Sequence, residues 1–178
     1  MSNVMNARRH LVLVGLMGAG KSTVGARCAE RLDRPFVDTD DEIVLRAAMP
    51  FGEIWRTGGE ARFRELEREV VADVCASPEP LVIASGGGAI VDPENRRRFR
   101  DVGVVVWLRA ETAVLAARVG DGATRPLLAG DPEGALARLG AARQDAYAAS
   151  ADAVVDTDGR AIDEVADAVL DAYKEHGV

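Results

Sequence analysis

The sequence predicts an α/β domain in which a parallel β-sheet is covered by helices on both faces. Three observations lead to this prediction. Short, continuous apolar runs alternate with longer stretches whose apolar residues recur at helical spacing. A glycine-rich turn joins the first apolar run to the first helical stretch, and carboxylates or glycines follow the next two runs. Strands without a regular polar face are typical of parallel sheets that are buried on both sides.

Five apolar runs predict the strands of this sheet. They occupy residues 11–14, 35–38, 81–84, 103–108 and 153–156. Ligands of open parallel sheets bind beyond the carboxyl ends of the strands. We therefore expect the segments that follow the first three strands to form one cleft.

Helices are predicted between these strands. The longest regular stretch, 60–76, has apolar residues mainly at steps of three and four. A shorter helical turn at 54–57 is expected to end at Gly58 and Gly59, and residues 120–132 predict a mobile loop because they are rich in Gly, Pro and Asp. Residues 1–9 predict a loose terminus. The remaining helices are predicted at 23–32, 41–48, 93–100, 111–119, 132–149 and 161–175.

The bulk composition excludes several classes of protein. A length of 178 residues fits one domain, and the net charge of -7 argues against a nucleic-acid-binding protein, which would usually show a basic face. No stretch approaches the ~20 apolar residues of a membrane span. Cys28 and Cys75 fall in helical stretches and are expected to be free, buried thiols. We expect a cytoplasmic protein without membrane partners, and a monomer by default.

The stretch 15–22, GLMGAGKS, matches the P-loop pattern G-x-x-x-x-G-K-[ST] between a strand and a helix. Its glycines let the backbone wrap a phosphate group, and the helix N-terminus adds unpaired N–H donors. Lys21 is expected to reach the β- and γ-phosphates, and the Ser22 hydroxyl can ligate Mg²⁺. Only two of the 22 basic Lys and Arg residues are lysines, so a lysine here is unlikely to be accidental. The stretch therefore predicts a nucleotide-phosphate site.

Two further strand ends carry residues that suit a ligand. Asp38 and Asp40 follow the second strand, so one could serve Mg²⁺ through water while the other accepts a hydrogen bond from a substrate hydroxyl. Alone, this pair would more often cap the next helix, but its place opposite a P-loop makes us favour the ligand role. Glycines 86–88 follow the third strand, where Ser85 could hold a water on the metal. These glycines let a ligand approach the backbone closely, with a loose turn as the alternative.

The arginines are harder to assign from sequence alone. Arg125 lies in the predicted mobile loop, which could close over a transferring phosphate and neutralise its developing charge. We therefore favour Arg125 as a phosphate-binding residue. The run of three arginines at 96–98 is expected to be a solvated helix face.

Six motifs, in this order and spacing, resemble the shikimate kinase family of nucleoside-monophosphate-kinase-like P-loop proteins. The resemblance covers about residues 10–173. The motifs are GLMGAGKST at 15–23, FVDTD at 36–40, GEARFRELE at 59–67, SGGGAI at 85–90, TRPLL at 124–128 and ARQDAY at 142–147. The resemblance implies a five-stranded parallel sheet in the order 2-3-1-4-5. It also implies one kinase domain over 1–178, with a core of 10–38, 77–119 and 133–178, a shikimate-binding segment at about 39–76 and a lid at about 120–132.

The resemblance further implies phosphorylation of the 3-hydroxyl of shikimate by ATP and Mg²⁺, on the route to chorismate and the aromatic amino acids. It implies that Lys21, Asp40 and Arg125 are catalytic, with Asp40 as the base, and that Mg²⁺ is held by Ser22 and, through water, by Asp38. The ATP-binding residues that it implies are Gly18, Ala19, Gly20, Lys21, Ser22, Thr23, Arg118, Arg125 and Arg160. The shikimate-binding residues that it implies are Asp40, Trp55, Phe63, Arg64, Gly86, Gly87, Gly88 and Arg143.

Two alternatives stay open on the sequence. A gluconate kinase of the same fold would also bind a substrate with hydroxyls and a carboxylate, although Arg64 and glycines 86–88 favour shikimate. A non-catalytic, shikimate-sensing module could share the fold as well. Such a module would be expected to have lost Lys21, Asp40 or a carboxylate-binding arginine, and none of these is missing.

Overall fold

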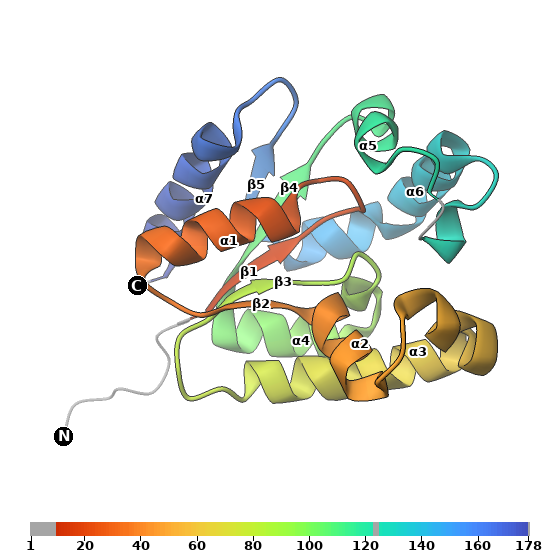
Figure 1. Cartoon of the computed structure of the whole chain (residues 1–178). Helices are drawn as coiled ribbons and strands as arrows, with labels where there is room; N and C mark the ends of the chain where they lie inside the picture. Colours follow the sequence, from red (N-terminus) through yellow and green to blue (C-terminus); the bar gives the residue numbers. More distant parts are fainter. Residues whose placement is uncertain (1–9, 123–124, 178) are drawn as a thin grey trace.

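The computed structural model describes residues 10–122 and 125–177, which form a parallel sheet between two layers of helices (Figure 1). The loose terminus predicted at 1–9 and Thr124 of the TRPLL motif lie outside the described residues. All strand pairs are parallel, and the order β2-β3-β1-β4-β5 confirms the fold class. The strands are β1 (His10–Val14), β2 (Phe36–Asp38), β3 (Val82–Ala84), β4 (Gly103–Arg109) and β5 (Ala153–Asp156).

Helices fill the connections between the strands, largely as predicted. Asp92 and Asp131 cap two of them with their side chains, and a proline follows each aspartate at the first helical position. The helices are α1 (Lys21–Leu32), α2 (Thr39–Ala47), α3 (Phe51–Cys75), α4 (Pro93–Val102), α5 (Thr112–Val119), α6 (Pro132–Ser150) and α7 (Ile162–His176). Two short 3-10 helices, η1 (Ala89–Val91) and η2 (Pro126–Leu128), were not predicted.

Two helices begin earlier than predicted. The turn predicted at 54–57 is the first part of α3, which begins at Phe51, and the break predicted at Gly58 and Gly59 is present. Gly59 has φ 67° and ψ -174°, so the predicted break exists as a kink within α3. Helix α2 begins at Thr39, two residues earlier than predicted, because the Asp38 side chain already caps its N-terminus.

The two faces of the sheet pack against different helices. On β1, Leu11 and Leu13 face the core that α1 and α7 cover, whereas Val12 and Val14 face the core that α3, α4 and α6 cover. This two-sided burial explains why the strands read as continuous apolar runs. A third cluster joins α2 to α3 and contains Ile43, Ile54, Phe63, Leu66 and Val70.

Further expectations from the sequence concern the two cysteines, the segment 120–132 and the lack of a membrane span. Cys28 and Cys75 are free and buried, as predicted. The segment predicted as an irregular loop at 120–132 contains η2, whose Leu128 is fully buried in the core. Among the described residues, no helix combines the length and the apolar character needed to cross a membrane.

Candidate active site

The three polar strand ends meet at one edge of the sheet, as expected for the carboxyl ends of parallel strands. The glycine-rich turn after β1, the carboxylates after β2 and the glycines after β3 all contribute to one hollow. Residues that line it include Gly18, Lys21, Ser22, Thr23, Asp38, Asp40, Gly87, Arg118 and Arg125. The structure therefore brings most of the predicted phosphate- and metal-binding residues together.

The P-loop has the backbone geometry that its glycines allow. Gly15 has φ 146°, and a Cβ there would lie 2.4 Å from the carbonyl oxygen of Leu108, so a side chain has no room. Gly20 is the N-cap of α1 and also has a positive φ of 94°. No side chain caps α1, which leaves the first N–H groups of this helix available to an anion.

Lys21 folds against the loop that carries it. Its Nζ donates to the carbonyl oxygens of Gly15 at 2.7 Å and Leu16 at 3.0 Å. Burial lowers the pKa of Lys21 to about 8, while the charges of Asp40 and Asp38 act in the opposite direction. Because this pKa stays above neutral pH, Lys21 is mainly a cation beside the expected phosphates.

Ser22 and Asp38 are in direct contact. The Ser22 hydroxyl donates to Asp38 Oδ2, while Asp38 Oδ1 accepts a hydrogen bond of 3.0 Å from the backbone N–H of Asp40. Asp38 therefore caps α2, which was the alternative considered from the sequence, and its other carboxylate oxygen faces the P-loop. Among the described residues, no group of three His, Cys, Asp or Glu side chains could hold a metal ion. The Ser22 hydroxyl and the Asp38 carboxylate suit Mg²⁺, because this ion binds few protein oxygens and completes its coordination shell with phosphate oxygens and water.

Asp40 is a partly buried carboxylate between two cations. Burial, and next the charge of Asp38, raise the pKa of Asp40, whereas Lys21 and Arg125 lower it. Arg125 Nη1 lies 3.6 Å from Asp40 Oδ2. A Cβ on Gly86 would lie 2.6 Å from Asp40 Oδ1, so the absence of a side chain at Gly86 makes room for this carboxylate.

A neighbouring pocket holds both arginines that the resemblance assigns to the shikimate carboxylate. Arg64 comes from α3 and Arg143 from α6, and Arg143 is only 5% exposed. The same pocket contains Asp40, Trp55, Phe63, Gly87 and Gly88. A Cβ on Gly88 would lie 2.6 Å from Arg64 Nη1, so the glycine leaves room for this guanidinium group.

The apolar wall of the pocket comes from the first part of α3. The ring of Phe63 lies 4.9 Å from that of Phe51 and 5.3 Å from that of Trp55, between centroids. Arg125 lies over Phe51, with its guanidinium carbon 6.0 Å from the ring centroid. The segment that carries Arg125 therefore contacts this wall as well as Asp40.

Sequence reasoning missed two residues that hold the pocket together. Glu67 is 1% exposed and accepts hydrogen bonds of 2.8 and 3.1 Å from Arg64 Nη1. Burial raises the pKa of Glu67 to about 7, although Arg64 opposes this shift. The i, i+3 spacing of Arg64 and Glu67 could have indicated the pair. Tyr147 donates a hydrogen bond of 2.6 Å to the Gly87 carbonyl, a contact between distant segments that no local pattern signals.

Arg118 and Arg160 occupy different settings. Arg118 Nη1 donates to the Gly18 carbonyl at 3.2 Å and to Thr157 Oγ1 at 3.0 Å, which places it beside the P-loop. Arg160 donates to the backbone carbonyls of Asp156 and Glu164, both at 3.0 Å. It is not among the residues that line the hollow around the P-loop.

Comparison with known proteins agrees with the predicted family. The chain matches the family model described as shikimate kinase over residues 17–174. A shikimate kinase of Symbiobacterium thermophilum is 45% identical over 171 residues, which cover 94% of this chain and 98% of that protein. A solved structure of the shikimate kinase from Acinetobacter baumannii in complex with shikimate has a TM-score of 0.91 and 33% identity, and the match covers 96% of this chain and 95% of that one. A gluconokinase from Sinorhizobium meliloti, 18% identical with a TM-score of 0.57 over 97% of this chain and 95% of its own, shares the fold alone. The chain therefore belongs to the shikimate kinase family.

Proposed function

We propose that this chain transfers the γ-phosphoryl group of ATP to the 3-hydroxyl of shikimate, giving shikimate 3-phosphate and ADP. The observation that carries this proposal is one pocket in which Asp40, Arg64 and Arg143 meet beside the P-loop. Membership of the shikimate kinase family supports the same reaction. The gluconokinase match is too distant to favour gluconate as the acceptor.

On the donor side, the P-loop holds the phosphates of ATP. The N–H groups at the start of α1 and the Lys21 ammonium supply positive charge where negative charge accumulates during transfer. Ser22, and Asp38 through water, would hold Mg²⁺, which supplies further charge neutralisation when bound. Arg118 contacts the Gly18 carbonyl and is placed to meet the nucleotide beside it. For Arg160 we propose a nucleotide contact that requires its side chain to leave its backbone partners.

On the acceptor side, Arg64 and Arg143 bind the shikimate carboxylate. Two guanidinium groups suit this role because each can bond a planar carboxylate through paired N–H donors. Asp40 accepts the hydrogen bond of the reacting hydroxyl, and its raised pKa makes it a better base than an ordinary aspartate. The backbone around Gly86, Gly87 and Gly88 approaches the ring hydroxyls. Trp55 and Phe63 form the apolar wall.

The segment at about 120–132 acts as the lid over this pocket. Its residues Arg125, Pro126 and Leu127 line the pocket together with Phe51 and Trp55 of α3. A lid excludes water, which favours transfer to the sugar-like hydroxyl over hydrolysis of ATP. Arg125 reaches Asp40 and would turn toward the transferring phosphate once nucleotide is bound.

The domain bounds, the oligomeric state and the cellular location are part of the same proposal. We assign one kinase domain to 1–178, with a core of 10–38, 77–119 and 133–178 and a shikimate-binding segment at about 39–76. The separate cluster that joins α2 to α3 supports treating this segment as a unit. We propose a monomer that acts in the cytoplasm on ATP and shikimate, without nucleic-acid or membrane partners.

A coupled ADP-release assay with shikimate and gluconate side by side tests the function. We expect turnover that requires Mg²⁺ and shikimate, with little ADP release on gluconate. Turnover on gluconate alone would overturn the assignment of the acceptor. Shikimate binding without turnover, in a folded and Mg²⁺-loaded preparation, would instead support the sensing module.

A further inference from the structure

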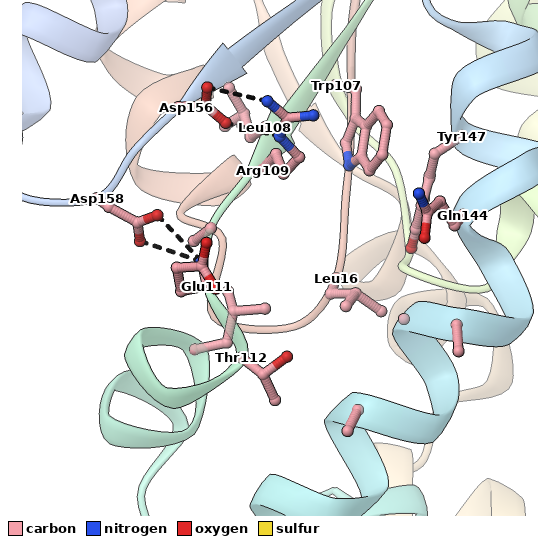
Figure 2. Close-up of a pocket in the computed structure, with 15 residues that line it drawn as sticks. Leu16, Trp107, Leu108, Arg109, Glu111, Thr112, Gln144, Tyr147, Asp156 and Asp158 are labelled. Atoms are coloured by element: carbon pink, nitrogen blue, oxygen red, sulfur yellow. Dashed lines mark hydrogen bonds and ion pairs between the residues drawn. The ribbon is translucent and has the colours of Figure 1, made fainter.

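Outside the two pockets of the proposed active site, a further pocket lies on the face of the sheet that α6 covers (Figure 2). It has a volume of about 730 Å³ and is bounded by the end of β4, the start of α5, the end of β5 and α6. Its Trp107 belongs to the core that α3, α4 and α6 cover, whereas the P-loop helix α1 covers the opposite face. None of the described residues that line it is one that we assign to ATP, Mg²⁺ or shikimate. A space of this size accommodates a small organic ligand.

One wall of this pocket carries excess negative charge. Arg109 and Asp156 neutralise each other through hydrogen bonds of 2.7 and 3.0 Å. Glu111 and Asp158 also line the pocket, and both carboxylate oxygens of Asp158 accept from the backbone N–H of Glu111, at 3.2 and 3.1 Å. Because the two carboxylates exceed the cations of the lining, this wall favours a positively charged group.

The opposite wall offers hydrogen-bond donors. Figure 2 shows Trp107 and Gln144 across the open space from Glu111 and Asp158. The Trp107 ring packs between Tyr147, at 5.4 Å between centroids, and the Arg109 guanidinium, at 5.6 Å. Trp107 is partly buried and Gln144 is exposed, and both line the pocket, so the indole N–H and the side-chain amide can donate to a ligand. This wall therefore suits an acceptor atom of a ligand.

The surface between these two walls is apolar and shaped by small residues. Leu16 and Leu115 line it together with Ala137, Gly140 and Ala141 of α6. A Cβ on Gly140 would lie 3.2 Å from Leu16, so the glycine lets α6 approach the P-loop closely. A flat apolar body would bury its surface against these side chains.

We propose that this pocket binds a small organic ammonium compound. Its ammonium group pairs with Glu111 and Asp158, its apolar body lies on Leu16 and the small residues of α6, and an acceptor at its far end meets the indole N–H of Trp107. Tyramine, which has an ammonium group, a flat ring and a phenol oxygen, is a suitable probe.

The test uses the two tryptophans of the chain, which give two indole N–H signals in a ¹⁵N-labelled protein. Tyramine is titrated with ADP, Mg²⁺ and shikimate present in excess, so that the proposed active site is occupied. We expect the Trp107 signal, identified by its loss in Trp107→Phe, to shift in a saturable way while the Trp55 signal stays unchanged. An unmoved Trp107 signal at millimolar tyramine, or a shift of Trp55 alone, would overturn the proposal.

Matched probes and variants test the chemistry of the two walls. p-Cresol lacks the ammonium group and 4-hydroxyphenylacetate replaces it with a carboxylate, so both should bind more than about tenfold more weakly than tyramine. Glu111→Gln should weaken tyramine binding about two- to fivefold, as expected for an exposed charge pair. Gln144→Leu should weaken it less, while Asp171→Asn, a change in a carboxylate of α7 outside the pocket, should leave it unchanged. Equal binding of tyramine and p-cresol, or no effect of Glu111→Gln, would exclude the ammonium site. Because the readout is binding, the result does not depend on kinase activity.

Discussion

The two halves of the proposed active site are built in different ways. The phosphate half is built mainly on backbone N–H groups and one lysine around the single stretch 15–22, with Asp38, Arg118 and Arg125 at its border. The acceptor half uses side chains that α2, α3, α6 and the segment around Arg125 bring together. Burial raises the pKa of the acceptor-side carboxylates Asp40 and Glu67, whereas Lys21 keeps a pKa of about 8. The phosphate half should therefore keep its charge at neutral pH, and the acceptor half should respond to substitution and to pH.

The largest effect is expected for Asp40→Asn. The change keeps the shape of the side chain but removes the proton acceptor, so kcat should fall by about 10²- to 10⁴-fold. Because burial disfavours the ionised form of Asp40, the variant should be at least as stable as the parent. Steady-state kinetics and thermal unfolding measure the two effects, with the neighbouring carboxylate variant Asp41→Asn as the control. A loss of less than tenfold would mean that Asp40 positions the hydroxyl without removing its proton.

Lys21→Ala tests the phosphate half. Removing a cation that stabilises developing charge should lower kcat by about 10²- to 10³-fold. The matched control is Lys174→Ala, because Lys174 is the other lysine of the chain and forms an exposed pair with Asp171. Turnover is measured at saturating ATP and shikimate for both variants. Near-normal turnover of Lys21→Ala would refute the phosphate role.

Arg64→Ala separates the two halves by substrate. The change removes a guanidinium group that we propose binds the shikimate carboxylate. Its loss should cost roughly 2 to 5 kcal/mol and raise the KM for shikimate more than tenfold. The KM for ATP should change little, because Arg64 lies in the acceptor pocket. Arg62→Ala removes an exposed arginine of the same helix and serves as the control. Equal increases of both KM values would indicate that Arg64 has a structural role.

The same contrast explains which features could be predicted from sequence. The P-loop is contiguous, so its strand, turn and helix fix the positions of Lys21 and Ser22 locally. The acceptor residues are far apart in sequence, and physical reasoning alone did not select Arg64 and Arg143 among many arginines; the family resemblance did. The contact of Tyr147 with Gly87 depends on how α6 packs against the sheet, and no local pattern encodes it.

Some differences from the predicted elements have local causes. Helix α2 begins early because Asp38 caps it. The break predicted at Gly58 and Gly59 is present, because Gly59 takes a positive φ at the kink within α3. The two short 3-10 helices are too brief to show a periodic pattern. Glu67 belonged to a recognised motif, but its burial could not be deduced from the motif, since the same spacing occurs in exposed pairs such as Arg62 and Glu65.

Glu67→Gln should have the smallest effect on turnover and the clearest effect on pH dependence. The pKa of Glu67 in the folded protein is about 7, above its ordinary value of 4.5. The folded state therefore holds this proton more tightly than the unfolded state, and the stabilisation is complete below about pH 4.5 and lost as the pH rises through 7. Between pH 5 and 7, this group should lower the free energy of unfolding of the parent by about 2 kcal/mol. Glu67→Gln should remove that decrease, as measured by chemical denaturation across this range.

The comparison of Glu67→Gln with Glu65→Gln isolates the buried carboxylate from an exposed one on the same helix, because Glu65 pairs with Arg62 at the surface. Glu65→Gln should keep the pH dependence of the parent. Glu67→Gln should also raise the KM for shikimate by a few fold, less than Arg64→Ala, because the amide can still accept one hydrogen bond from Arg64. If the unfolding curves of parent and Glu67→Gln show the same pH dependence, Glu67 is ionised throughout this range. In that case the Arg64–Glu67 pair is a fixed ion pair, and the pH response of the acceptor half depends on Asp40.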